Sequence, residues 1–498
     1  MRGSKINIRV ILKIIGLLLV LEGFFIITSI PFSIYYGSPT NLSFSLFNGK
    51  DDFWALVISG IFVSTIGLIV WLMTRRAKDS SLGKREGYVI VSLSWLVISL
   101  FGSIPFILSG SIPNFTNAFF ETISGFTTTG ASILNDIEAL PKGILFWRSM
   151  THWMGGMGII VLTLAILPFL GIGGMQLFIA EVPGPTPDKI HPRITATAKR
   201  LWGIYVLLTA AETILLMTGG MDLFDAICHA FGTMATGGFS TQNASIANYS
   251  PYIQYVIILF MIFAGINFTL HYLALHGKLK TVWKNEELRY YLKLMGGVTI
   301  IIAASLILTH GLGIEKGFRD ALFQVVSITT TTGFVTTNYL NWPFFLWMII
   351  FILMFAGGCA GSTGGSIKMV RQLLLLKNSL LELKRLIHPH AIIPVRINGK
   401  PVSQDIISNI LAFFLIYILI FSLGSVFMSF IGLEFESAVG SVAATLGNIG
   451  PAIGSVGPAS NYADIPVVGK WFLSFLMLLG RLELFTILIL LSPAFWKR

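Results

Sequence analysis

Long apolar segments, separated by short polar stretches, recur along the whole chain. Each is close to or above the length of about 20 residues that an α-helix needs to cross the hydrocarbon core of a bilayer. They cover residues 11–33, 54–74, 88–109, 145–169, 200–218, 252–275, 294–312, 343–375, 405–432 and 469–492. This pattern predicts an all-α polytopic membrane protein with ten transmembrane helices. The first run follows a basic start, as in a signal peptide, but it is long enough to span and no A-x-A site follows it, so we interpret it as a retained helix.

A second pattern occurs four times, in the gaps after the third, fifth, seventh and ninth spans. In each copy an Asn, Asp or Ser precedes an alanine, and a glycine follows that alanine twelve positions later. The copies are Asn117-Ala118 with Gly130, Asp225-Ala226 with Gly238, Asp320-Ala321 with Gly333, and Ser437-Ala438 with Gly450. Because Asn, Asp and Ser satisfy free amide hydrogens of a first helical turn, each copy predicts a short helix that breaks before its glycine. About nine residues reach only about 14 Å, roughly half of the hydrocarbon thickness.

Strings of Thr, Gly and Asn follow the four short helices, at residues 127–132, 236–241, 330–337 and 445–454. Non-helical backbone at membrane depth survives only where it is buried in protein or lines water. A single string of this kind is common in membrane proteins, but four in one register indicate four loops around one central pore. The carbonyls of such loops can replace the hydration shell of a cation, and glycine allows the backbone to turn them inward. The candidate filter residues are Thr128, Thr129, Gly130, Gly237, Gly238, Thr331, Thr332, Gly333, Asn448, Ile449 and Gly450.

These segments, with TGGF in the second loop and ATLGNIGPAIG near the C-terminus, resemble the Trk/Ktr/HKT superfamily of cation transporters, and its TrkH branch in particular. The resemblance extends from about residue 88 to the end of the chain. It implies four membrane-pore-membrane repeats around one pore, and K⁺ bound at the filter residues, because members with serine at the first filter glycine tend toward Na⁺ and this chain has Gly130. It also implies a homodimer in the cell (inner) membrane, above a cytosolic ring of TrkA-type regulatory subunits that bind ATP, ADP or NAD. No cofactor is expected in this chain itself.

The expected organisation is two extra N-terminal helices followed by four repeats. The predicted units are residues 1–86; repeat 1, 87–195, with its filter at 127–132; repeat 2, 196–290, with 236–241; repeat 3, 291–400, with 330–335 and a broken inner helix at 357–365; and repeat 4, 401–498, with 447–452.

Composition and charge agree with a membrane location. Hydrophobic residues make up 54% of the chain and charged residues only 11%, against about 25% charged in soluble domains. The net charge of +11 does not indicate nucleic acid, because most of the 34 Lys and Arg residues fall in the loops of one side. By the positive-inside rule that side is cytoplasmic and holds both termini. The opposite side carries more acidic than basic groups, Glu121, Asp225 and Asp320 among the acidic ones and Arg148 among the basic, and would concentrate cations, although Asp225 and Asp320 can equally serve as helix caps.

A glycine-rich break interrupts the eighth span. Five glycines cost roughly 1 kcal/mol each in a helix relative to alanine, so this span is expected to open into a loop just below the filter. They are Gly357, Gly358, Gly361, Gly364 and Gly365. Arg481 lies within the tenth span, where a charge costs about 2.5–3.5 kcal/mol, and is expected to face the cavity and donate to carbonyls. The family resemblance implies that this loop and arginine restrict ion passage. The alternatives are a simple kink and a local pair between Arg481 and Glu483.

Enzymatic chemistry is not indicated. The chain has no H-E-x-x-H, no G-x-S-x-G and no Walker A motif, and Cys228 and Cys359 are expected to be apolar fillers that hold no transition metal. The inside segments 171–199, with His191, and 376–403, with His388 and His390, are either plain loops or a docking surface for a soluble partner. Besides a K⁺ channel, two other classes stay open: a Na⁺-conducting or K⁺/H⁺ or K⁺/Na⁺ coupled carrier, and a membrane-embedded enzyme or scaffold.

Overall fold

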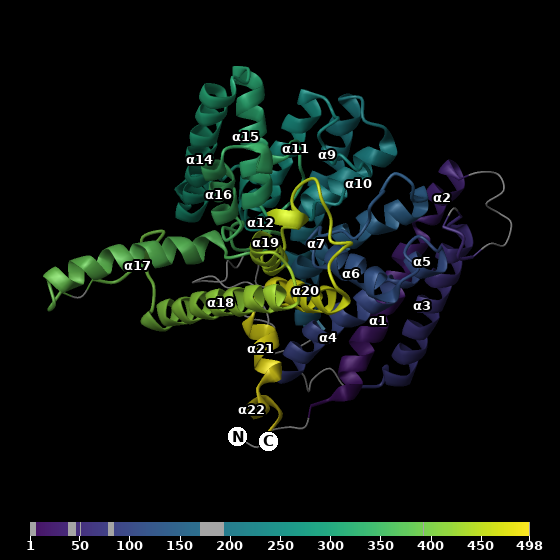
Figure 1. Ribbon diagram of the computed structural model, residues 1–498. Coiled ribbons are helices and arrows are strands. Elements are labelled where there is room, and N and C mark those ends of the chain that lie inside the picture. The colour runs from purple at the N-terminus through teal and green to yellow at the C-terminus, as the bar shows by residue number, and fades with distance from the viewer. Residues whose placement is uncertain are drawn as a thin grey trace.

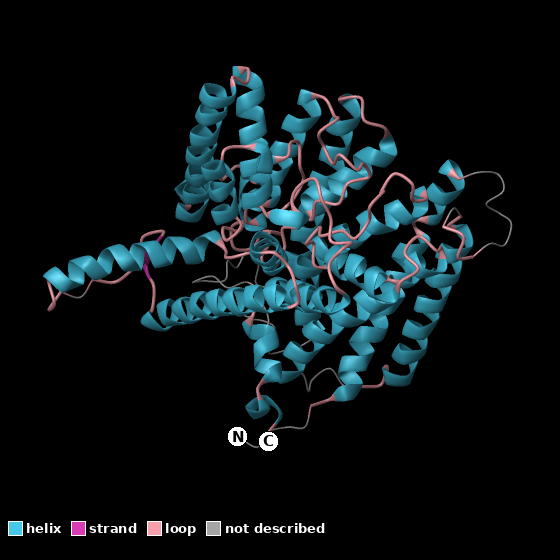
Figure 2. Cartoon of the chain, in the orientation of Figure 1, coloured by secondary structure: helices cyan, strands magenta, loops and turns pink. Residues whose placement is uncertain are grey.

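The computed structural model describes residues 6–37, 46–49, 51–77, 84–169, 194–391 and 393–497. In this part of the chain nearly all regular structure is helical (Figure 2), apart from one antiparallel hairpin, β1 (Arg396–Ile397) with β2 (Lys400–Pro401). The predicted all-helical class is therefore confirmed. Residues 171–193, which include His191, lie outside the described ranges.

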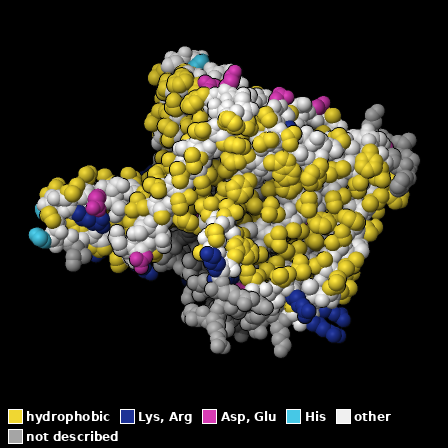
Figure 3. All heavy atoms as spheres, turned by 60° about the horizontal axis from the view of Figure 1, so that its bottom comes forward, with side chains coloured by type: hydrophobic (Ala, Val, Ile, Leu, Met, Phe, Trp, Pro, Cys, Tyr) yellow, Lys and Arg dark blue, Asp and Glu magenta, His cyan; other side chains and the backbone are white. Residues whose placement is uncertain are grey.

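Six helical stretches of the described chain are long and apolar enough to cross a membrane, and two bent helix pairs raise the number to eight. The six are formed by α1 (Ile8–Ile27) with α2 (Ile30–Tyr36), α3 (Phe53–Thr74), α4 (Lys84–Gly102) with α5 (Ile104–Leu108), α9 (Ile194–Thr218), α14 (Glu286–His310) and α18 (Gln404–Phe430). A further long helix, α7 (Lys142–Phe169), is not counted among them. Apolar side chains cover most of the surface between a basic edge and an acidic edge (Figure 3). An apolar surface of this extent fits contact with lipid.

Two of the predicted continuous spans are wrong. The sixth, 252–275, is split into α11 (Pro251–Ala264) and α12 (Phe268–Leu275), which meet at 103°. The tenth, 469–492, is split into α20 (Val467–Arg481) and α21 (Phe485–Leu491), which meet at 119°. At the first break the backbone amide of Phe268 donates to the Gly361 carbonyl (3.1 Å) and not to its own helix. At the second break Leu484 has a left-handed backbone, with a φ of +54°.

The eighth span also breaks, at the glycine-rich segment. α16 (Phe344–Leu353) ends before that segment, and α17 (Met369–Ile387) begins after it and projects sideways from the body of the molecule (Figure 1). The remaining short elements are α13 (Leu279–Lys284), α22 (Pro493–Trp496) and the 3₁₀ turns η3 (Tyr339–Asn341) and η4 (Gly454–Val456). The start of α1 and the C-terminal helix α22 lie at the same end of the molecule (Figure 1).

Four short helices occupy the predicted places: α6 (Phe115–Phe126), α10 (Leu223–Met234), α15 (Ile314–Thr329) and α19 (Phe435–Leu446). Their predicted start was wrong. The capping residues are Asn114, Asp222, Gly313 and Glu434. The side chains of Asn114 and Asp222 accept hydrogen bonds from the amides three residues on, so Asn117 and Asp225 lie inside the first turn. We call these four elements the pore helices.

The two N-terminal helices pack tightly on each other and on the first repeat. α1 and α3 approach through glycines: a Cβ on Gly16 would lie 2.8 Å from the Gly67 carbonyl oxygen, and one on Gly23 would lie 2.7 Å from that of Gly60. Asp52, buried before α3, accepts hydrogen bonds from the Ser33 hydroxyl and from the Ile144 amide (3.0 Å) in the first turn of α7. The carboxylate thus fastens the helix pair to the start of α7.

Candidate ion-conducting site

All four pore helices end in the same backbone motif. The residue two before each repeat glycine has a left-handed conformation, with φ of +51° at Thr128, +55° at Thr236, +60° at Thr331 and +53° at Asn448. The amide of the following residue then donates to the carbonyl five residues back, for example Thr129 N to Ser124 O at 2.9 Å and Gly237 N to Gly232 O at 2.8 Å. This is the Schellman ending, which glycine usually makes. A non-glycine residue there costs about 1–3 kcal/mol, a strain of the kind that collects at functional sites.

Thr236 lies in the predicted filter segment 236–241 but was not among the individual candidate filter residues. It stands two residues before Gly238, in the register that Thr128, Thr331 and Asn448 hold in the other loops. The fourfold register was therefore enough to find it. Each pore helix ends on this left-handed threonine or asparagine, and the repeat glycine provides a second left-handed turn two residues further on.

The four repeat glycines are also left-handed, with φ of +77° at Gly130, +78° at Gly238, +83° at Gly333 and +92° at Gly450. Each loop therefore carries two left-handed residues separated by one. Such a backbone turns its carbonyls toward one side of the strand. Two left-handed residues so close together explain why the loop cannot continue as a right-handed helix.

The glycines bring the four loops together in a closed ring. A Cβ added to Gly130 would lie less than 3.0 Å from the carbonyl oxygen of Gly237 in the second loop. A Cβ on Gly238 would lie within the same distance of the Thr332 carbonyl oxygen in the third loop. A Cβ on Gly333 would lie within it of the Ile449 carbonyl oxygen in the fourth. The series closes where a Cβ on Gly450 would lie 2.7 Å from the Thr129 carbonyl oxygen. In each case the carbonyl belongs to the residue just before the repeat glycine of the neighbouring loop. The four loops therefore surround one axis in the order of the chain. All of the predicted filter residues lie on this ring of loops.

A buried ion pair fixes the first loop to the second. The Glu121 carboxylate accepts from Arg148 Nε (2.7 Å), from the Ser132 hydroxyl (2.9 Å) and from the Ile133 amide (2.9 Å). Arg148 also donates to the Ser240 carbonyl (2.9 Å). The side chains of Glu121 and Arg148 are only 1% and 2% exposed, so these two residues, counted from the sequence among the charges of the outer side, contribute no exposed charge. Burial makes the pair an internal brace, because removing either partner would leave a charge without compensation.

The other loops are held by polar side chains of their own pore helices. The Asp225 carboxylate accepts from the hydroxyls of Thr241 (2.7 Å) and Tyr249 (2.8 Å), and the Gln324 amide donates to Thr336 (3.3 Å). In the fourth repeat the Ser437 hydroxyl accepts from the Ser455 amide (2.9 Å). The sequence pattern predicted Asp225 as a helix cap or as an acidic group at the entrance of the pore. The structure gives the cap to Asp222 and buries Asp225. Asp225 anchors the strand that leaves the loop.

Further from the axis, the segments that follow the first and second loops are joined by hydrogen bonds. The Asn243 amide donates to Asp136 (2.9 Å), and its oxygen accepts from the Ile137 amide (2.7 Å). The Asn243 amide, together with two backbone amides, lowers the pKa of the exposed Asp136 carboxyl. Hydrogen bonds to the ionised form cause this shift, so Asp136 keeps its negative charge near the entrance to the ring at neutral pH.

The glycine-rich break lies against the carbonyl ends of the pore helices. The Thr363 hydroxyl donates to the Met234 carbonyl at the end of α10 (3.1 Å), and the Gly365 amide donates to the Thr331 hydroxyl after α15 (2.7 Å). A Cβ on Gly365 would lie 2.5 Å from the Gly447 carbonyl oxygen after α19. The break therefore packs directly beneath three of the four loops. Close backbone approach, as well as helix breaking, requires glycine there.

Arg481 connects this break to the first repeat. Its guanidinium donates to the Thr363 carbonyl (2.7 Å) and to the Gly155 carbonyl on α7 (3.0 Å), and the residue is only 3% exposed. Glu483 forms an ion pair with Arg371 (2.6 Å). Arg481 thus donates to carbonyls, as expected.

Three charged residues around the break were not predicted: Lys368, which donates to the Gly364 carbonyl, Arg371, and Glu287, whose carboxylate accepts from the amides of Ala360 (2.7 Å) and Val370 (3.1 Å). Lys368 and Arg371 directly follow the glycines in the sequence, which is a signal that could have found them. The predicted gate residues Gly357, Gly358, Gly361, Gly364 and Gly365 all lie in this one segment.

Other candidate chemistry has no support in the geometry. Cys228 and Cys359 are fully buried, and burial keeps a thiol neutral. Among the described residues there is no group of three or more His, Cys, Asp or Glu that could hold a metal ion. His388 and His390 are exposed beyond the end of α17.

Comparisons with known proteins agree with this geometry. The model of the TrkH family, described as cation transport protein, matches residues 55–498. The chain is 43% identical to the Trk system potassium uptake protein TrkH of Salmonella typhimurium and to that of Escherichia coli, over 99% of this chain and 100% of each relative. The crystal structure of the potassium transporter TrkH from Vibrio parahaemolyticus superposes with a TM-score of 0.87 at 38% identity, over 99% of this chain and 100% of that one. These relatives are named as transporters, which agrees with the prediction that the chain is not an enzyme.

The ring geometry makes a test possible with two matched glycines. Gly238 and Gly220 are both left-handed, but a Cβ on Gly238 would strike the Thr332 carbonyl, whereas one on Gly220 would meet nothing within 4 Å. We expect Gly238→Ala to lower Rb⁺ uptake into proteoliposomes at least about tenfold, equivalent to about 1.4 kcal/mol of barrier. Gly220→Ala carries the same backbone strain and should keep wild-type uptake. Equal uptake in the two variants would contradict the ring.

Proposed function

The chain belongs to the TrkH family of cation transport proteins, and on that premise we propose that it takes up potassium ions across the cell membrane through the ring of four loops. The observation that carries this proposal is the closure of the ring, in which each repeat glycine leaves room only for a carbonyl of the next loop. Carbonyl oxygens around one axis can replace the water of a partly dehydrated K⁺. The pore helices direct their carboxyl ends, which are partly negative, to the same place.

In this proposal the chain has ten transmembrane helices, two N-terminal ones and eight that flank the four pore helices. The repeats follow the boundaries predicted from the sequence, and both termini are cytoplasmic. Support comes from the four identical helix endings and from the distribution of charge. Lys and Arg side chains gather at the lower edge of the molecule and acidic ones at the upper edge (Figure 3), as the positive-inside rule requires for cytoplasmic termini.

Potassium selectivity is proposed to depend on Gly130. A serine there would adopt a left-handed backbone and push its Cβ against the Gly237 carbonyl, which would remove one oxygen from the ring. We expect Gly130→Ser to admit Na⁺ and to weaken the preference for K⁺ by about tenfold, equivalent to about 1.4 kcal/mol. Competition of K⁺ and Na⁺ with Rb⁺ uptake by purified protein in liposomes measures this preference.

The same uptake experiment separates the alternatives. A Na⁺-conducting protein would lose Rb⁺ uptake to Na⁺ competition already in the wild type, and a coupled carrier would require a H⁺ or Na⁺ gradient. A membrane-embedded enzyme or scaffold would pass no Rb⁺ under any of these conditions. An unchanged K⁺ preference in folded Gly130→Ser would count against the four-loop filter while leaving transport itself in place.

We also infer that the glycine-rich break is the gate. The segment 357–365 lies under three loops and is held by Arg481, so an ion leaving the ring meets its backbone before it reaches the cytoplasm. A loop with several glycines can move without side-chain obstruction. Regulation would shift this segment aside and break the bonds from Arg481.

The gate proposal predicts a gain of flux. Arg481→Ala removes two charge-assisted hydrogen bonds, and each such bond contributes about 1.5–3 kcal/mol, so basal K⁺ flux without any partner should rise about tenfold or more. A shortened 357–365 segment should have the same effect. Lys384→Ala, which removes an exposed cation of α17, is the matched control and should change nothing. Folded variants with wild-type flux would remove the gate from this proposal.

The chain is further proposed to act as a homodimer above a cytosolic ring of TrkA-type subunits, on which ATP, ADP or NAD would bind. The basic loops near the termini and the segment 376–403 provide a surface for such a ring. α17 projects from the body (Figure 1) and exposes Leu376, Leu380 and Leu383 along one face, which a second subunit could cover.

The molecular mass of the purified protein tests the proposed homodimer, and co-purification tests the proposed regulatory ring. Light scattering of the purified protein should give twice the 54.7 kDa of one chain after correction for detergent. Co-purification from cells should recover a nucleotide-binding soluble protein. If only monomer is found and no such protein co-purifies, the regulated assembly is to be abandoned, whereas the proposed pore does not depend on it.

A further inference from the structure

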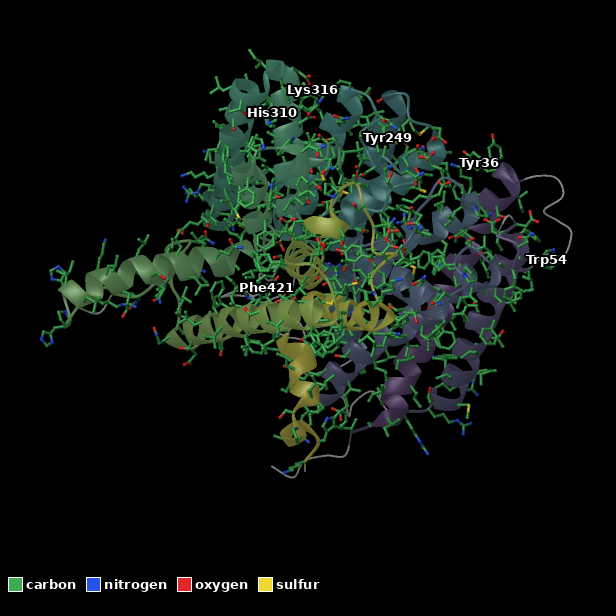
Figure 4. The ribbon with its side chains drawn as sticks, in the orientation of Figure 1. Tyr36, Trp54, Tyr249, His310, Lys316 and Phe421 are labelled. Carbon is green, nitrogen blue, oxygen red and sulfur yellow. The ribbon has the colours of Figure 1, made fainter. Side chains whose placement is uncertain are left out.

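A cavity of about 360 Å³ lies between α11, α14 and α15, at the end of the molecule away from the termini. Its walls come from the end of α14, the start of α15 and the segment that follows the third filter loop. His310 and Lys316 lie near each other at the top of the α14 and α15 hairpin (Figure 4), and both line the cavity. The cavity is separate from the ring and from the glycine-rich break.

The cavity contains a buried guanidinium whose Nε lacks an acceptor among the described residues. Arg319 is 9% exposed, and within the described part of the chain its Nε has no hydrogen-bond partner. The carboxylate of Glu315, which also accepts from Tyr255, lies 3.4 Å from Nη1 of Arg319 and is largely exposed. A guanidinium N–H withdrawn from water without an acceptor is unfavourable, so a ligand that brings an acceptor oxygen to Nε would relieve this deficit.

The charge of the lining selects an anion. Asp320 is the one carboxylate among the lining residues, against Lys316, Arg319 and the imidazole of His310. Thr336 and Asn341 add neutral groups that can donate hydrogen bonds. Guanidinium and ammonium groups with neutral donors are the usual partners of phosphate oxygens. We propose that the cavity binds a phosphate group, carried by an anionic phospholipid headgroup or by free inorganic phosphate.

The surroundings fit the headgroup of a lipid. The spanning helix α14 ends at His310, so the cavity lies where the hydrocarbon core gives way to headgroups. Large apolar side chains next to it are exposed, Leu308 by 83%, Ile314 by 78% and Phe318 by 41%. Acyl chains could cover these side chains while the phosphate enters the cavity.

A bound phosphate would also act on the ring. Thr336 and Thr337 line the cavity and follow Gly333 closely in the chain, and Ala247 lines it from the segment after the second loop. These two segments already bond to each other, since the Ile246 amide donates to the Val335 carbonyl (3.0 Å). The ligand would therefore hold the second and third loops together from outside. This role goes beyond the proposed transport of K⁺, and the binding can be measured without any ion flux.

The test measures ligand binding to the purified full chain in detergent. Thermal unfolding is followed with increasing phosphatidylglycerol, with phosphatidylcholine, and with inorganic phosphate. We expect phosphatidylglycerol to raise the Tm of the wild type, and Lys316→Gln to bind it about tenfold more weakly, because one charge-assisted contact is lost. Arg319→Gln should bind still more weakly. Since Arg319 is buried and its variant can fail to fold, the exposed Lys316 variant decides the outcome.

Lys142→Gln is the matched control. It removes a lysine that does not line the cavity, and it should bind phosphatidylglycerol as the wild type does. Stabilisation by inorganic phosphate that is lost in Lys316→Gln would support the site with free phosphate as its ligand. Equal phosphatidylglycerol and phosphate responses in the wild type, Lys316→Gln and Lys142→Gln would overturn the proposal.

Discussion

Four backbone segments meet around one axis at a distance that excludes side chains. Gly130, Gly238, Gly333 and Gly450 each face a carbonyl of the neighbouring loop, and even a methyl group there would overlap with it. Because the axis is lined by backbone, the four repeats can differ in side chains and still present equivalent oxygens. The rest of the structure holds this arrangement in place. The pore helices end at the ring, polar side chains of the pore helices bond the segments that leave the loops, and the glycine-rich break packs beneath them.

Strain and burial at the ring are offset by polar contacts immediately behind it. Left-handed threonines cost about 1–3 kcal/mol each, and the loop backbone leaves amides and carbonyls at membrane depth. The ion pair of Glu121 with Arg148 and the hydrogen bonds of Asp225 fix the outgoing strands. The anchoring group is a carboxylate in the first two repeats, an amide in the third and a hydroxyl in the fourth, so the repeats hold their loops with different side chains of the pore helices.

Positively charged side chains lie beneath the ring, on the side of the glycine-rich break. The carboxyl ends of the pore helices are partly negative, and Arg481 and Lys368 donate to carbonyls of the glycine-rich break that lies against them. Arg371 is paired with Glu483 close by. These cations hold the break in place and make the space below the ring less favourable for another cation. A segment held in part through such bonds can be released by a change in them, which fits the gate we propose.

The sequence by itself determined the class of the molecule, the four pore helices, the glycines of the ring and the position of the glycine-rich break. These features follow from local rules, namely hydrophobic length, the helix-breaking effect of glycine and a fixed spacing. Only the tertiary structure decided which charges are buried and with whom they pair. Glu121 and Arg148 are 27 residues apart, and Arg371 and Glu483 are 112 apart, so no local pattern joins them. It also decided where α11 and α20 end, because backbone groups released at such a break need partners that distant segments bring.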